Sequence, residues 1–103
     1  MNKAILHGRL TRDPEVRYTR DSKAVANFSL AVNRQHDREK TDFFNCETWG
    51  TLAEIVAKYL TKGSEIVVSG ELHVSSYEDK EGIKRTSTTL RVEELDFCGK
   101  KGE

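Results

Sequence analysis

The chain has 103 residues and a mass of 11.7 kDa, a size that fits a single domain. Seventeen Lys and Arg balance seventeen Asp and Glu, so the net charge alone points to no strongly acidic or basic partner. No apolar run approaches the roughly 18 residues of a membrane span, and the first residues are not followed by the apolar stretch of a signal peptide. We therefore expect a cytoplasmic protein that does not enter a membrane.

Positive charge is concentrated in the first forty residues, and the hydrophobic content of the chain is low. Residues 1–40 contain nine Lys or Arg and five Asp or Glu, a net charge of +4. Such a region can line a positive groove on a neutral protein, because charges more than about 8 to 10 Å away are largely screened at physiological salt. Hydrophobic residues make up 36% of the chain, which is lean for a self-sufficient core and favours burial between subunits.

Two segments in the first third alternate in polarity as strands do. In residues 4–10, the face with Ala4, Leu6, Gly8 and Leu10 lies opposite the face with Lys3, Ile5, His7 and Arg9. Pro14 ends this strand, and residues 20–23 form a turn. Residues 24–33 alternate most clearly, and the apolar face should lie on the core; it consists of Ala24, Ala26, Phe28, Leu30 and Val32. Residues 34–40 are charged and are expected to be a mobile loop.

Residues 43–49 form the third strand and carry aromatic residues on a polar face. Phe44, Cys46 and Thr48 share the face that can be buried. Phe43, Asn45, Glu47 and Trp49 share the other. An amide and a carboxylate are costly to bury without partners, so the second face is expected to be wet. Aromatic side chains on a wet sheet face indicate a binding surface.

A short helix follows this strand directly. Thr51 and Glu54 have the spacing of a capping box, which predicts a helix start immediately after Trp49. The apolar stripe of this helix has a period of 3.6 residues and comprises Leu52, Ile55, Val56, Tyr59 and Leu60. Lys62 and Gly63 supply a cation and a residue free to adopt a left-handed conformation near the helix end.

Two long strands complete the chain. Residues 65–77 alternate, with Ile66, Val68, Gly70, Leu72 and Val74 on the apolar face. Tyr77 lies on the mostly polar face. Residues 79–82 predict a hairpin tip with Gly82 near the position that requires positive φ. The last strand runs from Ile83 to about Phe97, and its apolar parity changes, which predicts a bulge near Glu93 and Glu94.

The cysteines and histidines show no spacing typical of a metal site. Cys46 is expected to be a small core residue, and Cys98 lies near the C-terminus. His7, His36 and His73 are scattered over different segments. No nucleophile elbow, phosphate loop or paired-carboxylate pattern is visible. We expect no metal, no cofactor, no catalytic residue and no enzymatic activity.

Five strands with one helix between the third and fourth is the element order of an OB-fold, an all-β Greek-key barrel. Four stretches resemble the bacterial single-stranded DNA-binding proteins: Asn2–Tyr18, Ala24–Asn33, Leu52–Ser64 and Gly70–Leu72. The resemblance covers about residues 1–97 in the same order and with similar spacing. It implies one OB-fold domain over residues 1–98, with residues 99–103 as a short C-terminal remnant.

The resemblance implies sequence-nonspecific binding of single-stranded DNA in replication, recombination and repair. In that family, barrel aromatics stack on unpaired bases, and the matching positions are Phe43, Trp49 and Tyr77. Positions that match or adjoin phosphate contacts are Lys3, Arg9, Arg17, Lys62 and Arg85, with Arg34 and Arg38 in the loop that wraps the strand. The family also forms tetramers, assembled from dimers through the first strand, in the bacterial cytoplasm at the nucleoid.

The chain departs from the family at three places. His36 stands in the loop where some members carry a tryptophan, so a weaker stacking contact is expected there. Phe44 replaces a histidine that some members have at a subunit contact, which bears on tetramer strength. Residues 98–103 lack the glycine-rich, acidic tail that full-length members use to recruit enzymes, so few tail-dependent partners are expected.

Other functions are compatible with the same pattern. Phe43 or Tyr77 taken alone is as well explained by an edge or an interface between subunits as by a ligand. OB-folds also bind RNA and oligosaccharides, and a primosomal single-strand binder has a similar fold. A comparison of binding to single-stranded DNA, RNA, duplex DNA and glycans discriminates among these.

Overall fold

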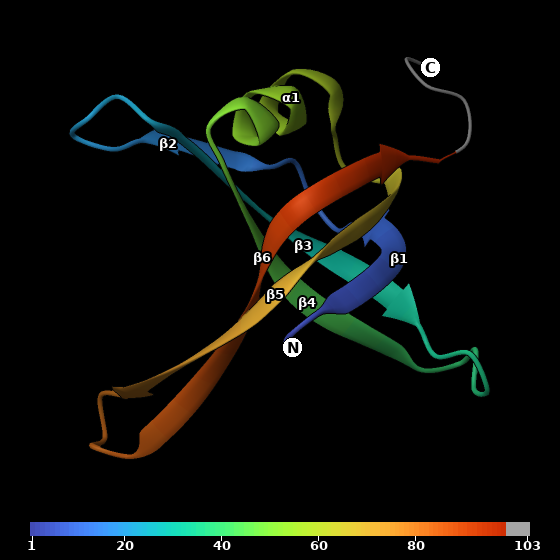
Figure 1. The fold of residues 1–103 in the computed structure, drawn as a ribbon. Helices are drawn as coiled ribbons and strands as arrows, with labels where there is room; N and C mark the ends of the chain where they lie inside the picture. The colour runs from blue at the N-terminus through green and yellow to red at the C-terminus, as the bar shows by residue number, and fades with distance from the viewer. Residues whose placement is uncertain (99–103) are drawn as a thin grey trace.

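The computed structural model describes residues 1–98, and the expected C-terminal remnant at 99–103 lies outside this range. Its elements are β1 (Ala4–Leu10), β2 (Glu15–Tyr18), β3 (Ala24–Asn33), β4 (Thr41–Trp49), α1 (Thr51–Tyr59), β5 (Glu65–Glu78) and β6 (Lys84–Phe97) (Figure 1). The all-β prediction, with one helix after the strand that ends at Trp49, is confirmed. The closed ring contains the five strands expected, and Glu15–Tyr18 forms an additional short strand that was not predicted and that pairs with β3. No helix in residues 1–98 is long and apolar enough to cross a membrane.

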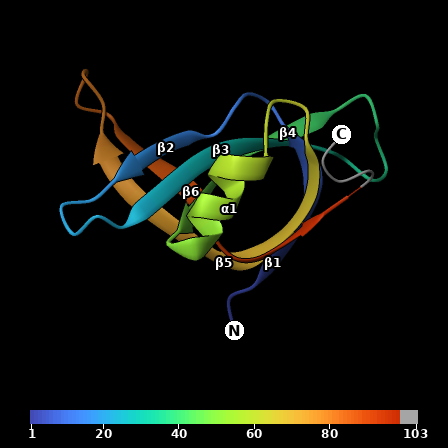
Figure 2. The ribbon, with the colours of Figure 1, turned by 90° about the horizontal axis from the view of Figure 1, so that it is seen from above.

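The strands form one sheet that closes on itself. Their order is β1-β5-β6-β4-β3-β2, and β1 also pairs with β3 at Arg9↔Ala31 and Leu10↔Leu30. This second pairing turns the sheet into the barrel of an OB-fold. The buried core includes Leu10, Phe28, Leu30, Cys46, Val56, Ile66, Val68 and Leu90. In the view from above, α1 lies over the end of this barrel (Figure 2).

The helix packs as its apolar period predicts but begins differently. Val56 and Leu60 are buried, whereas Tyr59 is about half exposed and meets Phe97 edge to face at 6.1 Å between ring centres. The predicted capping box is wrong, because the N-cap residue is Gly50, with φ 62°, and no side chain caps the helix. Thr51 is therefore already the first helical residue, and its hydroxyl is not placed to serve as the cap.

The two long strands form a hairpin that extends well beyond the barrel (Figure 1). The register shifts between Ser69 and Gly70, which face Glu94 and Val92, so Glu93 is the extra residue of the predicted bulge. Gly82 has φ 79° at the tip, as expected. Val74 shares the parity of the buried residues Ile66 and Val68 but is 66% exposed, because the hairpin has left the barrel at that point.

Candidate nucleic-acid interface

The predicted aromatic residues share one face of the sheet. Side chains directly opposite each other on paired strands point to the same face, and the register therefore arranges this face in rows. The rows are Arg17–Val25–Trp49; Glu15–Asn27–Glu47–Arg91–Glu71; Ser29–Asn45–Thr89–His73; Ala31–Phe43; Ser75–Ser87; and Tyr77–Arg85. We call these residues the outer face. It runs from β2 across β3, β4 and β6 onto the projecting part of β5.

The two outer-face aromatics of β4 are widely spaced along the strand. Phe43 and Trp49 are six residues apart, which corresponds to roughly 20 Å along a strand. Phe43 is 66% exposed, and Tyr77 on the β5 arm is 52% exposed. His36 is exposed in the loop between β3 and β4. The flat rings thus stand in solvent at separate points of the surface.

Trp49 is less exposed than Phe43 because neighbouring polar groups hold its indole. The guanidinium carbon of Arg91 lies 4.8 Å from the ring centre. The indole Nε1–H donates to Oε1 of Glu47 at 2.8 Å, and Glu47 is also 4.0 Å from Arg91. Val25, which faces Trp49 across the strand pair, is fully buried although it lies outside the barrel core. The indole is therefore fixed in orientation before any ligand arrives.

A polar cavity of about 280 Å³ opens between these aromatics. Its lining includes Asn27, Asn45, Glu47 and Thr89 from the outer face, together with Arg12. Oδ1 of Asn27 is buried and has no hydrogen-bond partner among residues 1–98. A buried acceptor without a partner is costly, so a ligand that brings an N–H donor to Asn27 would be favoured there. The exocyclic amino group of a nucleobase is one such donor.

Four of the seven predicted phosphate-contacting cations are paired with carboxylates. Their pairs are Lys3–Glu94 at 3.8 Å, Arg9–Glu65 at 3.1 Å, Arg34–Asp42 at 3.0 Å and Arg85–Asp79 at 3.0 Å. Nε and Nη2 of Arg34 donate to the two carboxylate oxygens of Asp42. These hydrogen bonds lower the pKa of the Asp42 carboxyl and raise the pKa of the Arg34 guanidinium. All four pairs are exposed to solvent, where such pairs are worth little, so a phosphate can replace the carboxylate.

The other three predicted cations are free to meet a ligand. Within residues 1–98, the side chains of Arg17, Arg38 and Lys62 have neither an ion-pair nor a hydrogen-bond partner. Arg17 belongs to the row that contains Trp49. Arg38 is exposed in the β3–β4 loop, and Lys62 lies beyond the helix, where its backbone N–H donates to Asp13. The seven predicted cations are therefore spread over several parts of the chain: β1 and the residue before it, β2, the β3–β4 loop, the segment after α1 and the hairpin arm.

Two outer-face residues were missing from the predicted site. Arg91 and His73 lie in rows with Glu47 and Asn45. The sequence indicates that Arg91 belongs to this face, because it is six residues after the predicted Arg85 on the same strand and residues an even number apart share a face. Acidic residues occupy the face as well, among them Glu15 and Glu71, and their charge moderates the attraction of a polyanion.

The closed barrel and its aromatic face place the chain among the OB-folds, whose strand surfaces bind oligonucleotides or oligosaccharides. The sequence model of the Single-strand binding protein family matches residues 1–98, and the chain belongs to this family.

Relatives with this family's name are similar along almost the entire chain. A single-stranded DNA-binding protein of Clostridium perfringens is 47% identical over 98 residues, covering 94% of this chain and 65% of the relative. Single-stranded DNA-binding protein A of Bacillus subtilis is 44% identical over 105 residues, covering 98% of this chain and 61% of the relative. The chain thus spans a little under two thirds of the length of these two relatives.

Proposed function

We propose that residues 1–98 act as one OB-fold domain that binds single-stranded DNA without sequence preference and without enzymatic activity. In this role it would protect unpaired strands during replication, recombination and repair. Family membership supports the proposal, and the observation that carries it is the placement of Phe43, Trp49 and Tyr77 on one continuous sheet face. The names of the bacterial relatives agree with it.

Base stacking supplies the affinity in this proposal. Every base has a π face, so stacking tolerates any sequence and contributes roughly 1 to 3 kcal/mol per base. Phe43 and Tyr77 offer exposed rings, and Trp49 offers an oriented one. His36 provides a smaller ring on the β3–β4 loop. Duplex DNA keeps its bases stacked and paired, so these rings have nothing to engage there.

Phosphate contacts supply the salt dependence. Arg17, Arg38 and Lys62 can meet a phosphate without losing a partner. Lys3, Arg9, Arg34 and Arg85 exchange a carboxylate for a phosphate and so contribute less to binding. Each neutralised phosphate on a single strand contributes about −0.7 to the slope of log K against log salt.

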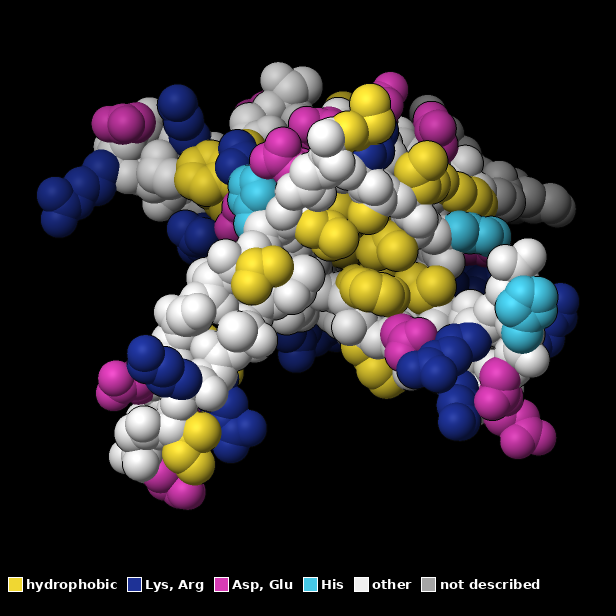
Figure 3. All heavy atoms as spheres, turned by 60° about the horizontal axis from the view of Figure 1, so that its bottom comes forward, with side chains coloured by type: hydrophobic (Ala, Val, Ile, Leu, Met, Phe, Trp, Pro, Cys, Tyr) yellow, Lys and Arg dark blue, Asp and Glu magenta, His cyan; other side chains and the backbone are white. Residues whose placement is uncertain are grey.

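We further propose a homotetramer built from dimers, in the bacterial cytoplasm at the nucleoid. The edge of β1 opposite β5 is unpaired from Ala4 to Gly8 within the described residues, because pairing with β3 begins only at Arg9. Ile5 on this strand is 69% exposed. Hydrophobic side chains also gather in the middle of the face seen in Figure 3. An open edge and exposed apolar groups are both satisfied by a second copy.

Linking several barrels raises the effective concentration of each site along one strand. Light scattering at micromolar concentration is expected to give four chains per particle, with a dimer as the smaller form. A monomer that still binds DNA tightly would contradict the assembly proposal while leaving DNA binding intact.

The test of function is a binding panel with labelled single-stranded DNA, single-stranded RNA, duplex DNA and a glycan. We expect single-stranded DNA of any sequence to bind most tightly, with duplex DNA much weaker. Tighter binding of RNA or the glycan would instead support another OB-fold module. Equal binding of duplex and single strands would contradict base stacking.

A further inference from the structure

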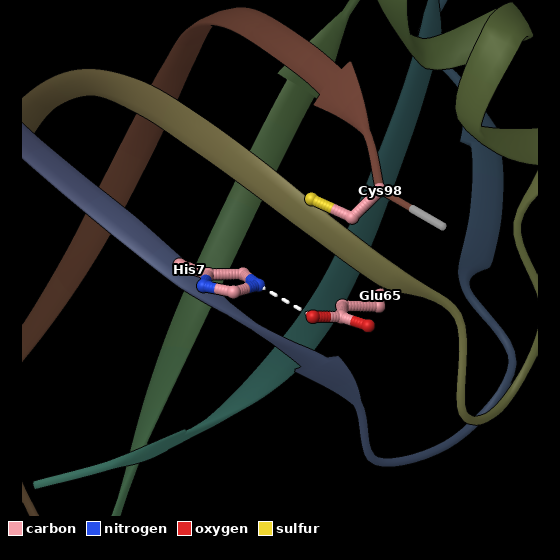
Figure 4. Close-up of side chains that lie close together, drawn as sticks. All are labelled: His7, Glu65 and Cys98. Atoms are coloured by element: carbon pink, nitrogen blue, oxygen red, sulfur yellow. Dashed lines mark hydrogen bonds and ion pairs between the residues drawn. The ribbon is translucent and has the colours of Figure 1, made fainter. Parts of the chain in front are cut away.

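Three residues with metal-binding side chains meet on the barrel surface, away from the row that contains Trp49. His7 lies on β1, Glu65 begins β5, and Cys98 follows β6 (Figure 4). Strand pairing brings them together: β1 pairs with β5 through Arg9↔Glu65, and the backbone N–H of Cys98 donates to the carbonyl of Glu65 at 3.0 Å. Their nitrogen, oxygen and sulfur ligand atoms all lie within 4.8 Å of one another.

This set of donors matches one metal better than others. Imidazole nitrogen, carboxylate oxygen and thiolate sulfur are the three protein ligands of Zn²⁺, which binds them at about 2.0 to 2.3 Å. Tetrahedral ligands at those bond lengths are roughly 3.5 Å apart. The sulfur of Cys98 therefore has to approach by up to about 1 Å, while the ligand atoms of His7 and Glu65, 2.6 Å apart, have to separate slightly. All three have room to do so, because His7 is exposed and the other two are partly exposed.

The carboxylate is already oriented for this role. Nη2 of Arg9 donates to Oε1 of Glu65 at 3.1 Å, while Oε2 faces Nε2 of His7 at 2.6 Å. One oxygen is thus held by an outer partner, an arrangement common at metal-ligating carboxylates. The other oxygen and the imidazole nitrogen point toward the same small volume, and an ion placed between them replaces their mutual hydrogen bond.

We propose that His7, Glu65 and Cys98 bind one Zn²⁺ ion per chain, with water in the fourth position. Cys98 binds as the thiolate, so its proton passes to solvent on binding, and His7 binds in its neutral form. The ion would connect β1, β5 and the end of β6. Because only the folded chain assembles the three ligands, Zn²⁺ should also stabilise the fold.

The expectation of no metal rested on sequence spacing, which cannot reveal this site. His7 and Glu65 are 58 positions apart, and only the pairing of β1 with β5 makes them neighbours. The chain also supplies a matched control. His73 and Glu71 form a similar contact of 2.7 Å on the arm, also between exposed side chains, but no cysteine lies within ligand distance of them in residues 1–98.

The test uses Co²⁺ as a visible substitute for Zn²⁺ on the 103-residue chain, in a buffer with a reductant that contains no thiol. We expect a sulfur-to-cobalt charge-transfer band that saturates at one Co²⁺ per chain, releases protons and disappears when Zn²⁺ is added. Cys98→Ser should abolish the band. His7→Gln and Glu65→Gln should each weaken binding by at least the roughly 10- to 100-fold that loss of an outer partner costs.

His73→Gln should leave the titration unchanged, and thermal unfolding of each variant without metal confirms that it is folded. Protection of Cys98 from alkylation by Zn²⁺ provides a second measurement. The proposal is overturned if the parent shows no charge-transfer band, if Cys98→Ser binds as tightly as the parent, or if His73→Gln weakens binding as much as His7→Gln. Saturation at half an ion per chain would likewise overturn it, in favour of a bridge between copies.

Discussion

The guanidinium of Arg91 lies over the indole of Trp49, 4.8 Å from the ring centre. One ring face is therefore already covered by a cation in the unliganded chain. A nucleobase that stacks on Trp49 either uses the other face or displaces Arg91, which then becomes available to a phosphate. In both cases the surroundings of the indole change on binding, and the single tryptophan of the chain reports that change.

The first prediction concerns this stacking contact. The emission of Trp49 should be quenched at saturation with single-stranded DNA, and Trp49→Ala should weaken binding by about 1 to 3 kcal/mol. Fluorescence titration measures the first effect, and anisotropy of a labelled oligonucleotide measures the second. Tyr18→Ala is the matched control, since Tyr18 is an exposed aromatic on the opposite face of β2 from Arg17. Unchanged emission at saturation would argue against DNA contact at Trp49.

The second prediction compares a cation without a partner with one that has a partner. Arg17→Ala should reduce the magnitude of the salt slope by about 0.7, because Arg17 is free to neutralise a phosphate. Arg9→Ala should reduce it by less, because Arg9 is held by Glu65 and by the carbonyl of Gly63. Binding measured at several salt concentrations gives both slopes. Equal reductions would mean that the ion pair with Glu65 does not compete with DNA.

Much of the fold could be predicted because side chains alternate in strands of a half-buried sheet. The parity of residues 43–49 placed Cys46 and Thr48 in the interior, and both are fully buried. The change in parity near Glu93 located the bulge. By contrast, β2 has only four residues and all four are exposed. The strand therefore has no buried face, and the alternation of Glu15, Val16, Arg17 and Tyr18 is too short to distinguish it from a loop.

Other features depended on geometry that a local pattern does not contain. A capping box requires an extended N-cap residue, but the chain turns into α1 through Gly50 at positive φ, which leaves Thr51 inside the helix. The ion pairs of Arg9 and Lys3 join residues far apart in the chain. They arise only when β5 pairs with β1 and β6 pairs with β5, so no local sequence pattern reveals them.

The third prediction concerns the two thiols. Burial raises the pKa of Cys46 to about 12, and a thiol reacts as its thiolate. At pH 8, one thiol per folded chain should react with a disulfide reagent, and two should react in denaturant. Cys98→Ser should remove the fast reaction in the folded state, while Cys46→Ala should leave it. Two equally fast thiols in the folded parent would show that the barrel opens around Cys46.

The fourth prediction concerns Gly70, where β5 packs closely against its paired strand β6. A Cβ atom at Gly70 would overlap the backbone carbonyl oxygen of Arg91, which cannot move without shifting the strand. Gly70→Ala should therefore destabilise the fold by about 3 kcal/mol, near the upper end for overpacking. Gly82→Ala is the control, because a Cβ atom at Gly82 would have no other atom within 4 Å. This substitution should destabilise the fold by only about 1 to 2 kcal/mol, since the new side chain must adopt a left-handed backbone conformation. Urea unfolding measures both, and equal losses would contradict the overlap.

The last prediction concerns Asp79, which closes the tip of the hairpin that carries Tyr77. Its Oδ1 accepts from the backbone N–H groups of Glu81 at 2.9 Å and Ile83 at 3.0 Å, and its Oδ2 accepts from Nε of Arg85 at 3.0 Å. The backbone bond from Ile83 is the main cause that lowers the pKa of Asp79, followed by Arg85. The stabilisation is therefore complete above the unfolded pKa of about 3.9 and is lost as the pH falls through the lower folded value.

Two substitutions separate the roles of the two oxygens. Asp79→Ala should accelerate hydrogen exchange at Ile83 and along the arm while leaving the barrel amides protected, because the bonds at the tip are lost and the core is untouched. Asp79→Asn keeps an acceptor for the backbone N–H of Ile83 but cannot pair with Arg85 as a charge. It should therefore retain protection at the tip, free Arg85 for a phosphate, and steepen the salt slope of DNA binding by up to about 0.7. An unchanged salt slope in Asp79→Asn would show that Arg85 does not contact a DNA phosphate. Unchanged hydrogen exchange in Asp79→Ala would show that strand pairing alone stabilises the hairpin tip.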